Sequence, residues 1–144
     1  MGTLGCLCVA IWSQKPDRAH VKVQREKLEA AVARQEKRSG FLCVVADRTE
    51  PPEQPEREAS AAMIMSHDGK LDAVACVIEG SGFRAAISRM AISSMILLMR
   101  KVPPVRVFDQ VELVVPWLSA RLAAADFSTL AESITRARRA APRR

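Results

Sequence analysis

The sequence predicts an α/β fold: a single-layer, mostly parallel sheet of four to five strands with helices packed on it, plus an extra C-terminal helix. Short apolar runs alternate along the chain with longer amphipathic segments, which is the pattern of parallel strands joined by crossover helices. The apolar runs lack polar alternation, as strands buried on both faces do. A chain of 144 residues has room for about one such domain.

The N-terminal third predicts two strands and one helix. Residues 3–12 are apolar nearly throughout and predict a strand that ends at a Lys-Pro-Asp sequence. From Asp17 to Arg38 the chain is charged, with apolar residues at helical spacing, and this pattern predicts a helix with one wet face. Residues 41–46 form a second compact apolar run and predict the next strand.

The middle of the chain predicts another helix and strand. Three prolines within residues 51–55 exclude a central strand there. Residues 56–67 have helical composition, and Gly69 is placed to cap that helix in the left-handed conformation. Residues 71–78 predict the third strand.

Residues 83–101 predict a long helix with more apolar surface than one buried face needs. The stripe expected to face the core comprises Phe83, Ala86, Ile87, Met90, Ser94, Leu97 and Leu98. A second apolar group, the candidate interaction surface, comprises Ile92, Met95, Ile96 and Met99. Either this helix is covered on two sides, or the second group contacts another molecule.

The C-terminal part predicts a short fourth strand, residues 105–108, and two helices. The segment from Asp109 to Glu112 has the spacing of a capping box. Pro116 removes a hydrogen bond beyond the first turn, so the helix kinks there or begins later, near Val115. The final amphipathic helix, residues 126–139, is expected either to cover the third helix or to mediate self-association.

The chain divides into an α/β domain, residues 1–125, and a C-terminal amphipathic helix with a basic tail, residues 126–144. The net charge is +6, and the five arginines beyond residue 135 leave 17 basic against 16 acidic residues before them. Since aromatic residues are only 4% and the basic charge is confined to the tail, we do not expect a nucleic-acid partner. The arginine tail is either a solvated helix end or a peripheral contact to an anionic membrane.

Cysteine and histidine patterns give no sign of a metal or cofactor. The four cysteines lie in apolar runs and are expected to act as small buried hydrophobic residues of a reducing compartment. His20 and His67 lie in polar helix-terminal contexts without a partner, so we assign no catalytic residue. The apolar N-terminus lacks a basic region and is too short to span a bilayer, and we therefore expect a cytoplasmic protein.

Over residues 4–122 the order of elements resembles the STAS domain, the fold of anti-sigma-factor antagonists. The matching pieces are LCVAIW, the charged helix, FLCVVAD, DAVACVIEGSG, VRVFD, and Glu112 followed by the Trp117-Leu118 pair. The resemblance implies a bacterial-type regulator that binds a protein partner and performs no catalysis.

The phosphorylation motif of that family is missing. Family members carry a serine in the turn after the strand that ends in aspartate, and a partner kinase phosphorylates that serine. Here TEPPEQPE, residues 49–56, takes the place of that turn. Thr49 is the nearest hydroxyl and Ser60 lies inside the next helix. The resemblance therefore implies the fold and a binding role, but not the phosphorylation switch.

One loop offers a second hypothesis. Gly80, Ser81, Gly82 and Arg84 follow the third strand and open a helix, the place where α/β sheets commonly bind ligands. The loop lacks the spacing and lysine of a phosphate loop, and a simple turn capped by Ser81 explains it as well. The first hypothesis is thus a STAS-like protein-interaction module, with a second copy of the chain as one candidate partner. The alternative is a small-anion or nucleotide-binding domain, or a minor enzyme, that uses this loop.

Overall fold

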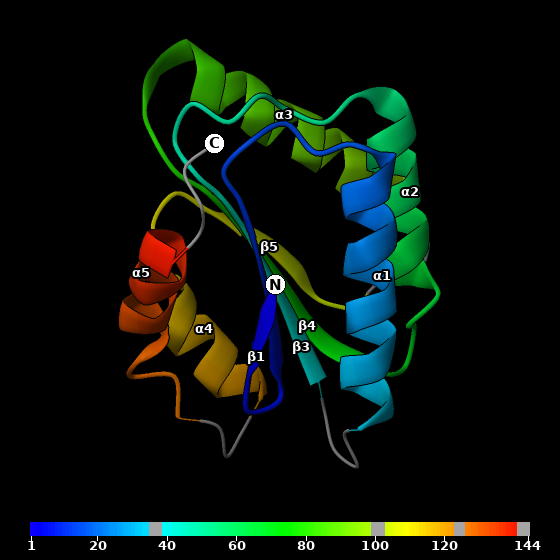
Figure 1. Cartoon of the computed structure of the whole chain (residues 1–144), viewed down its shortest axis with the longest axis vertical. Coiled ribbons are helices and arrows are strands. Elements are labelled where there is room, and N and C mark those ends of the chain that lie inside the picture. Colours follow the sequence, from blue (N-terminus) through cyan, green and yellow to red (C-terminus); the bar gives the residue numbers. More distant parts are fainter. Residues whose placement is uncertain (35–38, 99–102, 123–125, 141–144) are drawn as a thin grey trace.

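The computed structural model describes residues 1–34, 39–98, 103–122 and 126–140, and these form an α/β fold with one five-stranded sheet and five helices. The strands are β1 (Gly2–Leu4), β2 (Leu7–Trp12), β3 (Ser39–Val45), β4 (Leu71–Ile78) and β5 (Val105–Phe108). The helices are α1 (Arg18–Ala33), α2 (Gln54–Met65), α3 (Gly82–Leu98), α4 (Val114–Arg121) and α5 (Leu130–Ala140). Figure 1 shows the sheet between two groups of helices.

The strands follow one another across the sheet in chain order. β1 pairs antiparallel with β2, and the pairs β2–β3, β3–β4 and β4–β5 are all parallel. The central strands β3 and β4 are buried on both faces, which explains their unbroken apolar sequences. The prediction of a mostly parallel sheet is confirmed.

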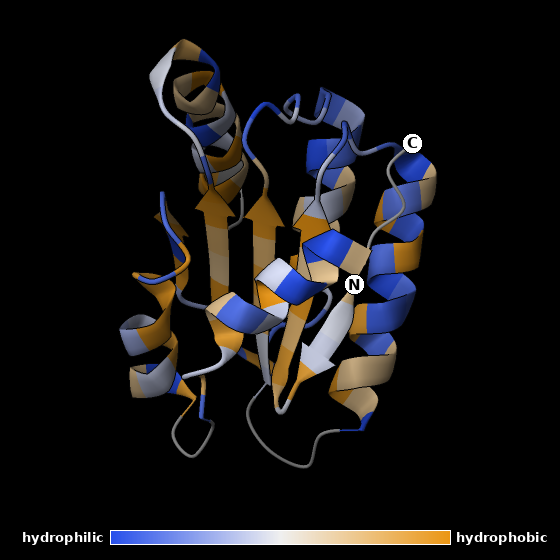
Figure 2. Ribbon diagram, turned by 60° about the vertical axis from the view of Figure 1, so that its left-hand side comes forward, coloured by the Kyte–Doolittle hydropathy of each residue, from blue (hydrophilic) through white to orange (hydrophobic). Residues whose placement is uncertain are grey.

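The helices cover the two faces unequally because of this order. When parallel strands advance in one direction, right-handed crossovers place every crossover helix on the same face. Helices α1, α2 and α3 accordingly pack on one face of the sheet, whereas α4 and α5, which follow the last strand, cover the other. Figure 2 shows the apolar strands enclosed between these layers.

The first expected strand is two strands. Gly5 adopts a left-handed conformation with φ of 56° and starts a two-residue turn, so that Leu4 pairs with Leu7. The prediction of one strand over residues 3–12 is therefore wrong, since the apolar composition concealed a hairpin. β1 becomes the antiparallel edge of the sheet.

The crossover helices begin and end near the expected positions. Asp17 caps α1: its side chain accepts a hydrogen bond from the His20 backbone N–H at 2.8 Å, and this bond lowers the pKa of the Asp17 carboxyl. Gly69 has a φ of 76°, but α2 already ends at Met65 with Ser66 as its cap, so the glycine serves the following turn. The predicted end of α1 at Arg38 lies outside the described residues.

The last two helices, α4 and α5, close the second core, which is the apolar layer between them and the sheet. The first core is the apolar layer between the sheet and helices α1, α2 and α3. Pro116 lies in the first turn of α4, where a proline is tolerated, so the helix begins at Val114 as the later alternative expected. The capping box from Asp109 to Glu112 does not form, because Leu113 precedes the helix and its side chain makes no capping bond. The Phe108 and Trp117 rings meet edge to face at 5.7 Å between their centroids.

Helix α5 packs on the sheet face opposite α3. Leu130 and Ile134 are buried there together with Phe127, which precedes the helix. The expectation that this helix covers the apolar surface of α3 is therefore wrong. Basic and apolar residues alternate along α5 because its apolar side packs against the core on this face of the sheet.

Candidate functional site

The two apolar groups on α3 face the opposite way from the prediction. Ile92 and Met95 of the candidate interaction surface are 9% and 8% exposed and belong to the core, and Ile96 packs against it. Met99 lies outside the described residues. The expected core stripe instead faces solvent, with Phe83 at 81% exposure and Met90 at 70%. The described residues of the predicted interaction surface are thus core residues.

Small residues explain this orientation. Ala85 and Ser88 are the buried residues in the first half of α3, on the same face as Ile92 and Met95. Their short side chains let the helix approach its neighbours, while the larger Phe83 and Met90 point away. An assignment by side-chain size alone selects the wrong face.

The solvent-exposed face of α3 carries a row of apolar side chains, here called the outer stripe. It consists of Phe83, Ile87, Met90 and Leu97, exposed by 81%, 37%, 70% and 85%. With Ser94 these positions alternate steps of four and three residues, which is the spacing of helices that pack against another helix. The charged residues within α3 are Arg84 and Arg89, both basic.

The predicted anion-binding loop lies at the carboxyl edge of the sheet. Gly80, Ser81, Gly82 and Arg84 are all exposed, and the two glycines have φ values of 94° and 83°. The structure thus places all four residues at the start of α3, as expected from their sequence positions. Whether they bind an anion stays a prediction.

Carboxylates surround this loop. The Asp47 side chain lies against Gly80 so closely that a Cβ atom on the glycine would be 2.2 Å from its Oδ1. The Glu79 carboxylate accepts a hydrogen bond from Arg138 Nη2 of α5 at 2.8 Å. Arg89 Nη2 donates to the Gly80 carbonyl at 3.2 Å. These contacts join the loop to the segment after β3 and to α5, and they place both carboxylates and guanidinium groups around it.

Neither a family model, nor a curated protein, nor a solved structure matches the chain.

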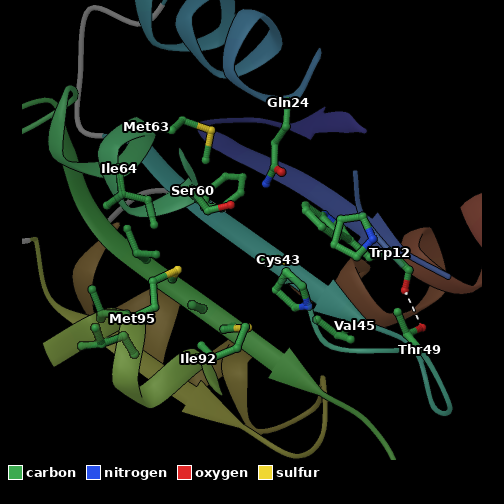
Figure 3. A pocket seen from close by; sticks show the side chains of 18 of the residues that line it. Trp12, Gln24, Cys43, Val45, Thr49, Ser60, Met63, Ile64, Ile92 and Met95 are labelled. Atoms are coloured by element: carbon green, nitrogen blue, oxygen red, sulfur yellow. Dashed lines mark hydrogen bonds between the residues drawn. The ribbon is translucent and has the colours of Figure 1, made fainter. Parts of the chain in front are cut away.

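A pocket lies between the first core face of the sheet and helices α1, α2 and α3 (Figure 3). It opens to solvent, and its enclosed part is small. Cys43 and Val45 of β3, Ser60 and Met63 of α2, and Met95 of α3 are among the residues that line it. The lining is predominantly apolar.

Gln24 is the polar residue of this pocket that the sequence interpretation missed. It is 5% exposed, and its side chain extends from α1 into the pocket (Figure 3). Its Oε1 atom is buried without a hydrogen-bond partner. Gln24 follows Val21 by three residues and precedes Leu28 by four, so it lies in the apolar stripe of the helix. This position could have indicated from the sequence that Gln24 is buried.

Two of the four cysteines, Cys8 and Cys76, have raised pKa values. Burial raises the pKa of the Cys8 thiol to about 11. A hydrogen bond with Cys43, its partner in the β3–β4 register, raises the pKa of the buried Cys76 thiol, and burial adds to this. Both Cys8 and Cys76 therefore remain protonated thiols near neutral pH.

The described residues contain neither a metal-binding cluster nor a helix that could span a membrane. No cluster of His, Cys, Asp or Glu side chains in that part of the chain could hold a metal ion. No described helix is long and apolar enough to cross a membrane.

The two histidines lie in different environments. His20 is exposed and bonded to Asp17, whereas the buried His67 ring lies 2.8 Å from the Met63 carbonyl.

Proposed function

We propose that this chain is a non-catalytic, STAS-like protein-interaction module that binds an amphipathic helix of a protein partner on the outer stripe of α3. The exposure of Phe83, Met90 and Leu97 on one helix face carries this proposal. Contiguous exposed apolar side chains are uncommon on monomeric proteins away from contact sites. The order of four parallel strands and their helices supports the STAS-like part of the proposal.

The chemistry of α3 indicates what kind of helix would bind. The seven-residue spacing of Phe83, Met90 and Leu97, with Ile87 between the first two, matches the apolar face of a second helix. Because Arg84 and Arg89 are the charged residues within Gly82–Leu98, the complementary helix carries acidic residues beside its apolar face. A second copy of α3 would bring like charges together, so we favour a different protein over a homodimer.

The test is site-specific photocrosslinking in the native lysate. A benzophenone amino acid at position 83 is expected to form an adduct with one partner, and the same amino acid at position 65 is not. Met65 is the matched control because it is an apolar helical residue, 39% exposed, on α2 rather than α3. Met90→Glu should weaken capture at least tenfold, since it places a charge in the centre of an apolar contact, whereas Met65→Glu should leave it unchanged.

The outcomes distinguish the occupants. An adduct of twice the mass of the chain would identify a homodimer. Equal adducts from positions 83 and 65, or none from position 83, would overturn the outer stripe as the binding surface. Binding that is unaffected by Arg84→Glu and by added salt would contradict an acidic partner.

A further inference from the structure

The pocket behind α3 has the properties of a ligand site independent of the outer stripe. Its walls come from strands β2–β5 and from three helices: Gln24 lies on α1, Ser60 on α2 and Met95 on α3. Side chains of the first core form these walls, and the pocket opens to solvent. Its position inside the first core means that an occupant would be largely removed from water.

Gln24 indicates that the occupant carries a polar group. A buried carbonyl oxygen without a partner costs free energy, and native structures rarely retain one without a reason. Here the unpartnered Oε1 belongs to a side chain that projects into the pocket. A ligand that donates one hydrogen bond to this oxygen would remove the cost.

The charges around the pocket select a neutral ligand. Among the described lining residues none is Lys, Arg or His, and the ionisable carboxylate is that of the exposed Glu50. Lys15, beside the lining residue Pro16, is already paired with the Glu53 carboxylate. An anionic ligand would find no counter-charge in the lining, and a cationic one would lose its hydration to an apolar cavity.

We propose that this pocket binds a small, neutral, mainly apolar molecule with one hydrogen-bond donor, which the Gln24 side chain accepts. The apolar part contacts Met63 and Met95, whose flexible thioether side chains adapt to the shape of a ring. The geometry assigns recognition to Gln24 and binding energy to the surrounding apolar surface. This site does not depend on the outer stripe, which lies on the other side of α3.

The test compares two probes of nearly the same shape, indole and indene, because only indole has an N–H donor. Calorimetric titration of the full chain is expected to give one site, with indole binding about five- to tenfold more tightly than indene. That ratio is the usual worth of one neutral hydrogen bond. In Gln24→Leu the two probes should bind with equal affinity, because leucine keeps the volume but removes the acceptor.

Two further variants locate the binding. Ser60→Phe, which places a ring inside the pocket, should abolish indole binding, whereas Met90→Ser, which alters the outer stripe, should leave it unchanged. Equal affinities for indole and indene in the unmodified chain would overturn the proposal, as would indole binding that survives Ser60→Phe or a preference for indole that persists in Gln24→Leu. Failure of indole to bind at millimolar concentration would also overturn it. Loss of binding in Met90→Ser would place the probe on the outer stripe instead.

Discussion

At the scale of single residues, the informative positions are those where a side chain differs from its neighbours. Gln24 is a polar residue in the buried stripe of α1, and Gly80 is a left-handed glycine pressed against Asp47. Each of these residues is less favourable for folding than a typical residue at its position, so each needs a structural or functional reason. For Gly80 the reason is steric, since any side chain there would meet the Asp47 carboxylate and would also have to adopt a φ of 94°. For Gln24 no contact within the folded protein explains why a polar side chain is buried there.

Gln24→Leu is therefore expected to stabilise the ligand-free protein. The substitution removes a buried unsatisfied oxygen and adds apolar contacts in nearly the same volume, which is worth about 1 kcal/mol. For a chain of this length we expect a rise in Tm of about 2–4 °C. Thermal unfolding followed by circular dichroism measures the change. A lower Tm in Gln24→Leu would show that the amide makes a stabilising bond in the folded protein.

At the scale of elements, composition and periodicity predicted most of the secondary structure but not which way α3 faces. β4 and β5 have the expected bounds because they are short, apolar and bounded by turn residues. The hairpin at Gly5 was missed because β1 has only three residues and its turn, Gly5-Cys6, lies next to the apolar residues of β2. On α3 both faces are apolar, and periodicity cannot choose between two apolar faces.

Of the two candidate ligand sites, one could be predicted from the sequence and the other could not. The loop from Gly80 to Arg84 could be placed from the sequence, because a strand followed by glycines and a helix fixes its position in a parallel sheet. The pocket could not, since its walls come from segments far apart in the chain, from Gln24 to Met95. Its formation depends on how α1, α2 and α3 lie on the sheet, which is a property of packing.

Substitution of the two methionines of α3 tests the orientation of the helix. Met95, 8% exposed, contacts the first core, whereas Met90, 70% exposed, belongs to the outer stripe. Met95→Ala is expected to lower the free energy of unfolding by about 2–3 kcal/mol, and Met90→Ala by less than about 0.5 kcal/mol. Urea denaturation of both variants measures the difference. The reverse order would place the predicted stripe, with Phe83 and Met90, in the core.

At the scale of the whole molecule, the two helix layers make the sheet dependent on both ends of the chain. The second core is closed by α4 and α5, and the ion pair between Arg138 and Glu79 joins α5 to the end of β4. Without α5, the face of the central strands that carries Val44 and Val77 would lose part of its cover. The segments before and after residue 125 differ in composition. Their buried side chains nevertheless belong to one shared core.

Truncation after Leu122 is accordingly expected to unfold the domain and not merely to remove an appendage. The truncated chain loses Phe127, Leu130 and Ile134, which are 1%, 0% and 3% exposed. Removing each such side chain costs about 2–5 kcal/mol, and the sum approaches the whole stability of a small domain. Circular dichroism and proton NMR should show loss of cooperative unfolding and of dispersed methyl signals.

A matched control distinguishes the contribution of the buried apolar side chains of α5 to stability from the contribution of its charges. Arg136→Ala together with Arg139→Ala removes two exposed positive charges from α5 and keeps its buried face, so its Tm should stay within about 2 °C of the unmodified chain. If the chain ending at Leu122 instead unfolded cooperatively at the original Tm, residues 126–140 would be an independent appendage. The buried side chains of α5 would then contribute little to the stability of the sheet, and the division after residue 125 would be a true domain boundary.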